Sequence, residues 1–195
     1  MKFDIAELNA VIRNRRSLKP MKMSSKKIDN NIIETILENA NHAPSHGQTE
    51  PWRFIVFTCD GKRKLSEFQS ELYKEKMLGE DFKQVKFDQL IQNPIGVSHI
   101  IAICMKRQES EKLPEIEEIE AVACAVQNMH LTATCFGISA LWSSGFPTYT
   151  EEVKPFLNLS EKDKCLGFFY LGYSENGEWP KLEKRPISEK VTWIK

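Results

Sequence analysis

The residues best suited to bind a charged ligand lie where the first predicted helix ends. Arg13, Arg15, Arg16, Ser17 and Lys19 fall within one short stretch of the chain. Guanidinium groups donate paired hydrogen bonds to phosphate oxygens, and a hydroxyl adds another contact. The same cations also complement the negative end of a helix dipole. The local pattern is therefore compatible both with a phosphate site and with an ordinary helix terminus.

A second group lies in the loop 43–54, between the second predicted helix and the first predicted strand. Pro44 ends the helix and Pro51 keeps the approach to the strand extended. Between them stand a hydroxyl, an imidazole and amide or acid groups, which together can hold a polar planar ligand. His42 and His46 are four residues apart, but Pro44 separates them and no further ligand cluster accompanies them. We therefore expect no metal site.

Two further segments carry polar groups next to predicted structure. Trp142-Ser143-Ser144-Gly145 follows a predicted strand, where α/β sheets usually present ligand contacts. A buried tryptophan followed by an ordinary turn would give the same pattern. Lys184 and Arg185 precede a proline near the C-terminus, in a segment too polar for a core. A solvated tail is the alternative there.

The elements that would position these groups alternate along the chain. Asp4 and Asp29 can each cap an amphipathic helix, and a charged segment over residues 62–93 predicts a helical excursion. Short apolar runs rich in β-formers predict strands buried on both faces. These strands are expected at residues 54–57, 100–105, 138–142 and 165–171.

The segment 114–136 predicts the most informative helix. Val122, Val126 and Met129 lie on one apolar side of this helix, and Cys124 and Leu131 are among the apolar residues on its other sides. A helix that is apolar nearly all round must be buried on several sides, and a chain of this size has few places for it without a partner. We therefore expect a dimer whose interface includes this helix.

Composition limits the classes of function. The chain has 195 residues, of which 41% are hydrophobic and 28% charged, as expected for a single domain spanning residues 1–195. Its 27 basic and 27 acidic residues cancel, which argues against a nucleic-acid partner. No apolar run is long enough for a membrane span, and no secretory signal is evident, so we expect a cytoplasmic protein. Five widely spaced cysteines predict buried thiols with no redox pair.

The motifs together resemble a known family. Arg15-Arg16-Ser17 after an N-terminal helix, Ala-Pro-Ser-His followed by Glu-Pro-Trp-Arg-Phe, an apolar helix containing Gln127-Asn128, Trp-Ser-Ser-Gly and a closing Lys-Arg-Pro occur in this order. This order is similar to that of the FMN-dependent nitroreductase family, and in particular to its small single-domain branch. The resemblance covers nearly the whole chain, and the loop 43–54 is its most specific part.

The resemblance implies an α+β nitroreductase-like fold, with a central mixed β-sheet wrapped by helices. It also implies an intertwined homodimer with two FMN molecules at the subunit interface. The phosphate of FMN would be held by the cationic groups of both chain ends, and the isoalloxazine would be approached from the partner chain and bordered by the chain itself. The implied phosphate-binding residues are Arg15, Arg16, Ser17, Lys19, Lys184 and Arg185. The implied residues of the partner chain are Pro44, Ser45, His46 and Gln48, and those that border the flavin on its own chain are Trp142, Ser143 and Gly145.

The activity implied by the resemblance is electron transfer from NAD(P)H to nitro compounds, quinones or related conjugated acceptors by a ping-pong mechanism. The flavin would carry the chemistry, so no single side chain is expected to be catalytic. Another redox reaction on the same fold, such as enone reduction, dehalogenation or an oxygen-dependent reaction, remains an alternative. A flavin-binding storage or sensor protein without turnover is a further one.

Overall fold

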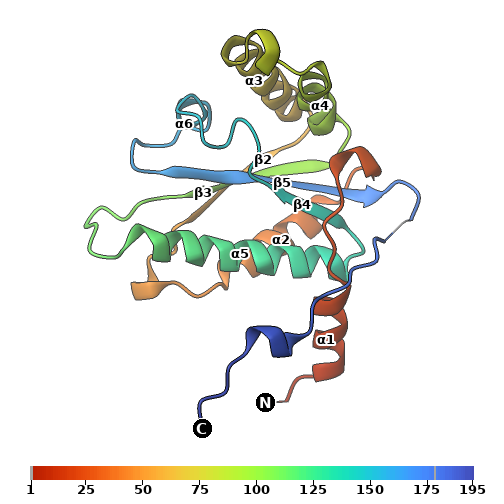
Figure 1. Cartoon of the computed structure of the whole chain (residues 1–195), viewed down its shortest axis with the longest axis vertical. Coiled ribbons are helices and arrows are strands. Elements are labelled where there is room, and N and C mark those ends of the chain that lie inside the picture. The colour runs from red at the N-terminus through yellow and green to blue at the C-terminus, as the bar shows by residue number, and fades with distance from the viewer. Residues whose placement is uncertain (1, 178) are drawn as a thin grey trace.

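The computed structural model describes residues 2–177 and 179–195, in which helices cover both faces of a central sheet (Figure 1). The helices are α1 Ile5–Asn14, α2 Asn30–Asn41, α3 Asp60–Lys76, α4 Gln84–Ile95, α5 Glu115–Cys135 and α6 Val153–Phe156. The strands are β1 Met23–Ser24, β2 Trp52–Phe57, β3 His99–Met105, β4 Ser139–Ser143 and β5 Lys164–Ser174. Short 3-10 turns lie at η1 Pro20–Lys22, η2 His46–Gln48, η3 Gly79–Asp81 and η4 Ile187–Lys190.

The sheet is built around β5, the longest strand. β3 pairs with one edge of β5, while β4 and β1 pair with successive parts of the other edge, and β2 pairs with β3. All of these ladders are antiparallel, so the expectation of a mixed sheet was wrong in this respect. Among the described residues, the parallel pairing is limited to one isolated bridge between Ser17 and Ala140.

Side chains alternate across the sheet and divide the core in two. Ile101 and Ile103 of β3 face α2 and α5, whereas Ile100 and Ala102 belong to the cluster that includes Leu65 of α3. In Figure 1, α2 and α5 lie on one face of the sheet, and α3, α4 and α6 lie on the other. Both faces of the sheet are therefore covered by helices. The candidate site residues lie at the end of β4, in the segments that connect the strands to these helices and in the chain ends.

The predicted helices form where their caps and apolar spacing place them. The Asp4 carboxylate accepts hydrogen bonds from the N–H groups of Ala6 and Glu7, and Asp29 accepts one from Asn31. The predicted excursion is the pair α3 and α4, joined by η3. The sequence missed β1, because two residues are too few to show a strand pattern. None of the helices in the described ranges is long and apolar enough to cross a membrane.

Burial differs from the predictions at two places. β3 is buried along its whole length, but β2 exposes Arg53 and Val56, so the expectation of strands buried on both faces was wrong for β2. Among the residues that the structure describes, β3 is the one strand that pairs with β2, and an edge strand of this kind leaves alternate side chains open to solvent. In α5, Ile116 and Cys124 are exposed on the side turned away from the sheet.

The expectation that all five thiols are buried was also wrong. Cys59, Cys124 and Cys135 are exposed, whereas Cys104 and Cys165 are buried. The two buried cysteines lie directly opposite each other on β3 and β5, which sequence spacing cannot show. The thiol of Cys165 donates to the carbonyl oxygen of Gly167 at 3.9 Å. A hydrogen bond with Cys165, together with burial, raises the pKa of Cys104, so Cys104 is held as a thiol inside the sheet.

Candidate functional site

The basic segment that follows α1 runs beside β4. Ser17 forms a parallel bridge with Ala140, and the N–H of Leu18 donates to the carbonyl of Ala140 at 3.1 Å. This bridge joins Ser17 to the second residue of β4. The structure therefore brings the segment that contains Arg15, Ser17 and Lys19 beside β4 at Ala140.

The buried side chain of His130 fixes this segment. Its Nε2 lies 3.0 Å from the carbonyl oxygen of Arg16, and its ring packs edge-on against Phe169 with centroids 5.4 Å apart. Burial lowers the pKa of His130 to about 4, and the hydrogen bond to Arg16 opposes that shift only in part. His130 is therefore neutral at physiological pH and donates to the Arg16 carbonyl from its Nε2.

The two adjacent arginines have different surroundings. Arg16 donates from Nε to the Pro180 carbonyl at 2.6 Å, and from Nη1 to the carbonyls of Arg13 and Arg15 at 2.6 and 2.9 Å. Arg15 is half-buried, and its guanidinium donates to the Ser17 hydroxyl at 3.4 Å. Arg16 therefore links three backbone carbonyl groups, whereas the hydrogen bond of Arg15 is to a neighbouring side chain.

The C-terminal segment passes the same end of α1. Besides the contact of Arg16 with Pro180, Trp179 donates from Nε1 to the Asn14 carbonyl at 2.5 Å. Lys184 and Arg185 follow a few residues later and are exposed. The two basic clusters predicted from the sequence thus belong to neighbouring segments, although they are far apart along the chain.

The end of β4 is held against β5 by tryptophan and glycine. Trp142 donates from Nε1 to the Leu166 carbonyl at 3.0 Å. Gly167 has φ +126°, and a Cβ added there would lie 2.5 Å from the Ser143 carbonyl oxygen and 2.9 Å from Trp142 Nε1. Only glycine tolerates both this backbone conformation and this contact. Ser143 is half-buried, and Gly145 after it is exposed.

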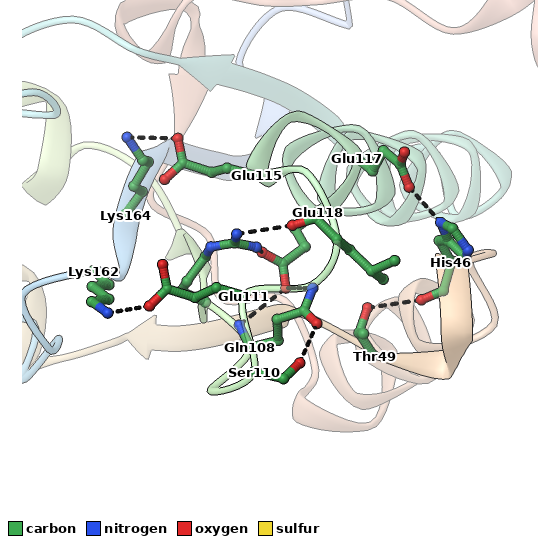
Figure 2. A network of polar contacts seen from close by, with 12 residues as sticks. His46, Thr49, Gln108, Ser110, Glu111, Glu115, Glu117, Glu118, Lys162 and Lys164 are labelled. Carbon is green, nitrogen blue, oxygen red and sulfur yellow. Dashed lines mark hydrogen bonds and ion pairs between the residues drawn. The ribbon is translucent and has the colours of Figure 1, made fainter.

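The loop 43–54 has the tight backbone that its composition suggests. Gly47 and Gln48 have φ of 59° and 54°, and the N–H of Glu50 donates to the Ser45 hydroxyl at 3.2 Å. Figure 2 shows His46 turned toward α5, where its Nδ1 lies 2.5 Å from Glu117 Oε2. Pro44 is exposed, Ser45 is half-buried, and the side chains of His46 and Gln48 are exposed. The loop therefore presents its polar groups at the surface.

The two halves of the predicted site lie at opposite ends of α5 within one chain. His46 contacts Glu117 in the first turn of α5, whereas the Arg15–Arg16 segment contacts His130 near its end. His130 lies thirteen positions after Glu117, which corresponds to about 20 Å along the helix. Figure 1 shows the same separation, with α1 beside one end of α5 and the loop before β2 beside the other. The structure does not bring these two halves together in a single chain.

Two residues near these groups escaped the sequence reasoning. Glu117 holds His46, and its role was hidden among the several acids of the first turn of α5. Lys86 of α4 is half-buried, and its Nζ lies 3.8 Å from the position that a Cβ at Gly145 would take. The only sequence signal for Lys86 is its position four residues before the buried Leu90, on the packing face of α4.

His42 and His46 have separate partners. His46 pairs with Glu117, and His42 pairs with Glu38 of its own helix at 3.5 Å. Across residues 2–177 and 179–195, no group of three or more histidine, cysteine or carboxylate side chains is arranged to hold a metal ion.

A further cavity lies elsewhere, between the start of β5, the loop before α6 and the N-terminal part of α5. Its volume is about 620 Å³. Lys162 pairs there with Glu111, and Lys164 pairs with Glu115 at 3.1 Å (Figure 2). Because these cations are neutralised by carboxylates, the cavity is poorly suited to a phosphate.

A buried ion pair supports the loop between this cavity and α5. Glu118 is 1% exposed and accepts hydrogen bonds from the Arg107 guanidinium and from the N–H of Gln108. Arg107 also donates to the Leu113 carbonyl at 2.8 Å. The pair is therefore part of the framework that holds the N-terminal end of α5.

Comparison with known proteins agrees with this architecture. The family model described as "Nitroreductase family" matches residues 12–173. The Bacillus subtilis protein named "Putative NAD(P)H nitroreductase YfhC" is 31% identical over 189 residues, covering 95% of this chain and 93% of the relative. The chain belongs to the nitroreductase family, whose members are FMN-dependent oxidoreductases.

Solved structures share the fold. The nitroreductase-like family protein from Bacillus cereus has a TM-score of 0.81 at 23% identity, and the match covers 100% of this chain and 98% of that one. The FMN-dependent nitroreductase NfnB from Mycobacterium smegmatis, solved in complex with NADPH, has a TM-score of 0.79 at 16% identity over 98% of this chain and 100% of that chain. The predicted α+β nitroreductase-like fold is thereby confirmed.

Proposed function

We propose that residues 1–195 form one FMN-binding domain that transfers electrons from NAD(P)H to nitro compounds, quinones or related conjugated acceptors in two successive half-reactions. FMN supplies the electron-transfer chemistry when it is bound. The observation that carries the proposal is the bridge that places the Arg15-Ser17-Lys19 segment beside β4 in a chain of this family. Relatives named NAD(P)H nitroreductases and a solved neighbour that binds FMN and NADPH support it.

The donor set of this chain fits the two parts of FMN. Arg15, Ser17 and Lys19 offer cationic and hydroxyl donors on one exposed edge, as a phosphate dianion requires. Lys184 and Arg185 would complete that half from the neighbouring C-terminal segment. Arg16 would act indirectly, because it already donates to three backbone carbonyls.

The isoalloxazine would lie beside the end of β4. Trp142 and Ser143 would border it, and Gly145 would allow close approach because it has no side chain. The hydrogen bond from Trp142 to Leu166 keeps the indole fixed, which preorganises that border. No side chain needs to act as a nucleophile in this arrangement.

We further propose that each site is completed by a second copy of the chain, as a homodimer. Pro44, Ser45, His46 and Gln48 lie about 20 Å along α5 from the Arg15 segment of their own chain, as judged from the contacts at Glu117 and His130. An antiparallel pairing of two α5 helices would place this loop of one chain beside the Arg15 segment of the other.

Two sets of exposed apolar side chains agree with a partner at this surface. Ile116 and Phe136 are exposed on and just after α5, and no residue of α1 is buried although Ile5, Leu8 and Ile12 lie on one stripe. Apolar groups of this kind gain stability when a second copy covers them.

A spectrum and a titration test the cofactor and the activity. Purified protein should show flavin absorbance after incubation with FMN, and addition of NADH or NADPH without oxygen should bleach it. An acceptor such as a nitroaromatic compound or a quinone should then restore the absorbance. A protein that stays colourless with FMN contradicts the cofactor assignment, and one that binds FMN without bleaching is a flavin-binding protein without turnover.

A mixed dimer tests the shared site. One chain carries Arg15→Ala and the other carries Ser45→Ala together with His46→Ala, so that each homodimer binds FMN weakly. In the heterodimer, one of the two sites keeps both unaltered halves and should recover FMN affinity. If heterodimers recover no affinity although they form, the site is contained within one chain.

A further inference from the structure

α4 carries a lysine on the face that packs against the rest of the protein. Lys86, Leu90 and Pro94 are spaced by four residues and therefore share one side of the helix. Leu90 and Pro94 are buried, and Lys86 is half-buried. A lysine on such a face has its aliphatic stem covered while its ammonium group is directed along the protein surface.

The ammonium group of Lys86 lies at the end of β4. A Cβ built on Gly145 would be 3.8 Å from Lys86 Nζ and 3.6 Å from Ser143 Oγ. Within residues 2–177 and 179–195, no carboxylate pairs with Lys86 Nζ and no acceptor receives a hydrogen bond from it. A partly desolvated cation without a partner is costly, so a ligand anion at this position would gain a strong contact.

A cluster of aromatic side chains begins next to Gly145. Phe146 follows Gly145 and meets the Tyr73 ring edge-on with centroids 5.4 Å apart. Tyr73 also contacts Phe82 at 5.5 Å, and Phe82 contacts Phe87 at 5.7 Å. Tyr73 is buried, but Phe82, Phe87 and Phe146 are each partly exposed. These four rings define the aromatic wall, which joins α3, α4 and the segment after β4.

We propose that Lys86 and the aromatic wall select the electron acceptor, and that the preferred acceptors are aromatic compounds carrying a carboxylate. This inference rests on the proposed function, since it places the acceptor beside the flavin border at Ser143 and Gly145. The ammonium group pairs with the carboxylate, and the wall packs against the ring of the acceptor. The phosphate of FMN is served by a different segment, that of Arg15 and Lys19.

The test compares acceptors that differ only in charge. The ratio of kcat/KM for 4-nitrobenzoate to that for 4-nitrobenzamide is measured on FMN-loaded wild-type protein, Lys86→Gln and Lys83→Gln. Lys83 is the matched control, because it lies at the start of the same helix but donates to the Glu80 carbonyl at 2.7 Å. We expect the wild type and Lys83→Gln to favour the carboxylate by about 10-fold or more, and Lys86→Gln to lose that preference.

Binding without turnover gives a second measurement. The dissociation constants of 4-hydroxybenzoate and 4-hydroxybenzamide are determined by calorimetry on the FMN-loaded proteins, with no NAD(P)H present. Lys86→Gln should raise the dissociation constant of 4-hydroxybenzoate by about 10-fold or more, whereas Lys86→Arg should retain most of the affinity. The FMN dissociation constant and the KM for NADPH are measured on the same variants.

The outcomes separate this inference from the proposed function. Absence of FMN binding or of reduction by NAD(P)H contradicts the proposed function itself. If FMN binds and is reduced, a wild type without carboxylate preference, or a Lys86→Gln variant that keeps it, overturns the role of Lys86. A Lys86→Gln variant whose main defect lies in FMN affinity or in the KM for NADPH also overturns it, because Lys86 would then serve a different ligand.

Discussion

Protonation of His130 should lower the stability of the protein in mild acid. The His130 side chain is 6% exposed, and burial lowers its pKa to about 4, whereas an unfolded histidine has a pKa near 6.5. Between these two pH values the unfolded chain binds a proton that the folded chain does not, so stability falls as pH decreases through this window. Above about pH 6.5 the full contribution is present, and below about pH 4 this group causes no further loss.

The size of the effect follows from the difference in pKa. Each pKa unit corresponds to 1.36 kcal/mol, so a difference of about 2.5 units corresponds to about 3 kcal/mol between neutral pH and the lower end of the window. His99 adds to the same trend, because burial and the charges of Lys62 and Lys27 lower its pKa as well. The contribution of His130 is therefore best obtained as a difference between two proteins.

The variant His130→Gln removes the titrating group and keeps an N–H donor for the Arg16 carbonyl. Urea denaturation, followed by tryptophan fluorescence at fixed protein and FMN concentrations, gives the free energy of unfolding between pH 7.5 and pH 4.5. The wild type should lose about 2 to 3 kcal/mol more over this interval than the variant. His42→Gln is the control, because His42 has a side chain that is 75% exposed. Equal pH dependence of wild type and His130→Gln would refute the argument.

Three further changes test the framework and the phosphate half of the site. Glu118→Gln should lower the free energy of unfolding by about 3 to 5 kcal/mol in urea denaturation, because it removes the negative charge that pairs with the largely buried Arg107 guanidinium, whereas Glu111→Gln at an exposed pair should cost less than about 1 kcal/mol. Gly167→Ala should cost about 3 kcal/mol or more and weaken FMN binding, whereas Gly79→Ala, where a Cβ has nothing within 4 Å, should cost only about 1 to 2 kcal/mol. Arg15→Ala should raise the FMN dissociation constant by about 10- to 100-fold in a fluorescence titration; an unchanged constant in a folded variant would contradict the phosphate assignment.

Local signals were sufficient for most elements of the fold. Asp4 and Asp29 cap their helices as predicted because an N-cap depends only on the residue and the N–H groups that follow it. The apolar run of β3 predicted a buried strand, and the strand is buried along its whole length. Parallel and antiparallel interior strands, however, look alike in sequence. For this reason the sequence did not reveal that the ladders are antiparallel.

Long-range pairing explains what the sequence did not reveal. Cys104 and Cys165 are sixty-one positions apart, and only the register of β3 on β5 places them opposite each other. Lys86 lay in the segment with the weakest apolar pattern, and its neighbour Gly145 comes from another part of the chain. Sequence spacing identifies groups that share one element, but it cannot identify groups that meet across the sheet.

The proposed homodimer predicts that ligand binding is linked to assembly, because the two halves of the candidate site lie at the two ends of α5. His130 holds the Arg15 segment at one end of the helix, and Glu117 holds His46 at the other. In the proposed homodimer, each chain would therefore contribute one half to each of two sites. A ligand that binds only when both halves meet stabilises the assembled state by mass action. FMN should therefore make the dimer harder to dissociate on dilution, and a substitution that loosens either end of α5 should weaken both FMN binding and assembly. If sedimentation shows the same dimer dissociation constant with and without FMN, the two halves do not belong to a shared site.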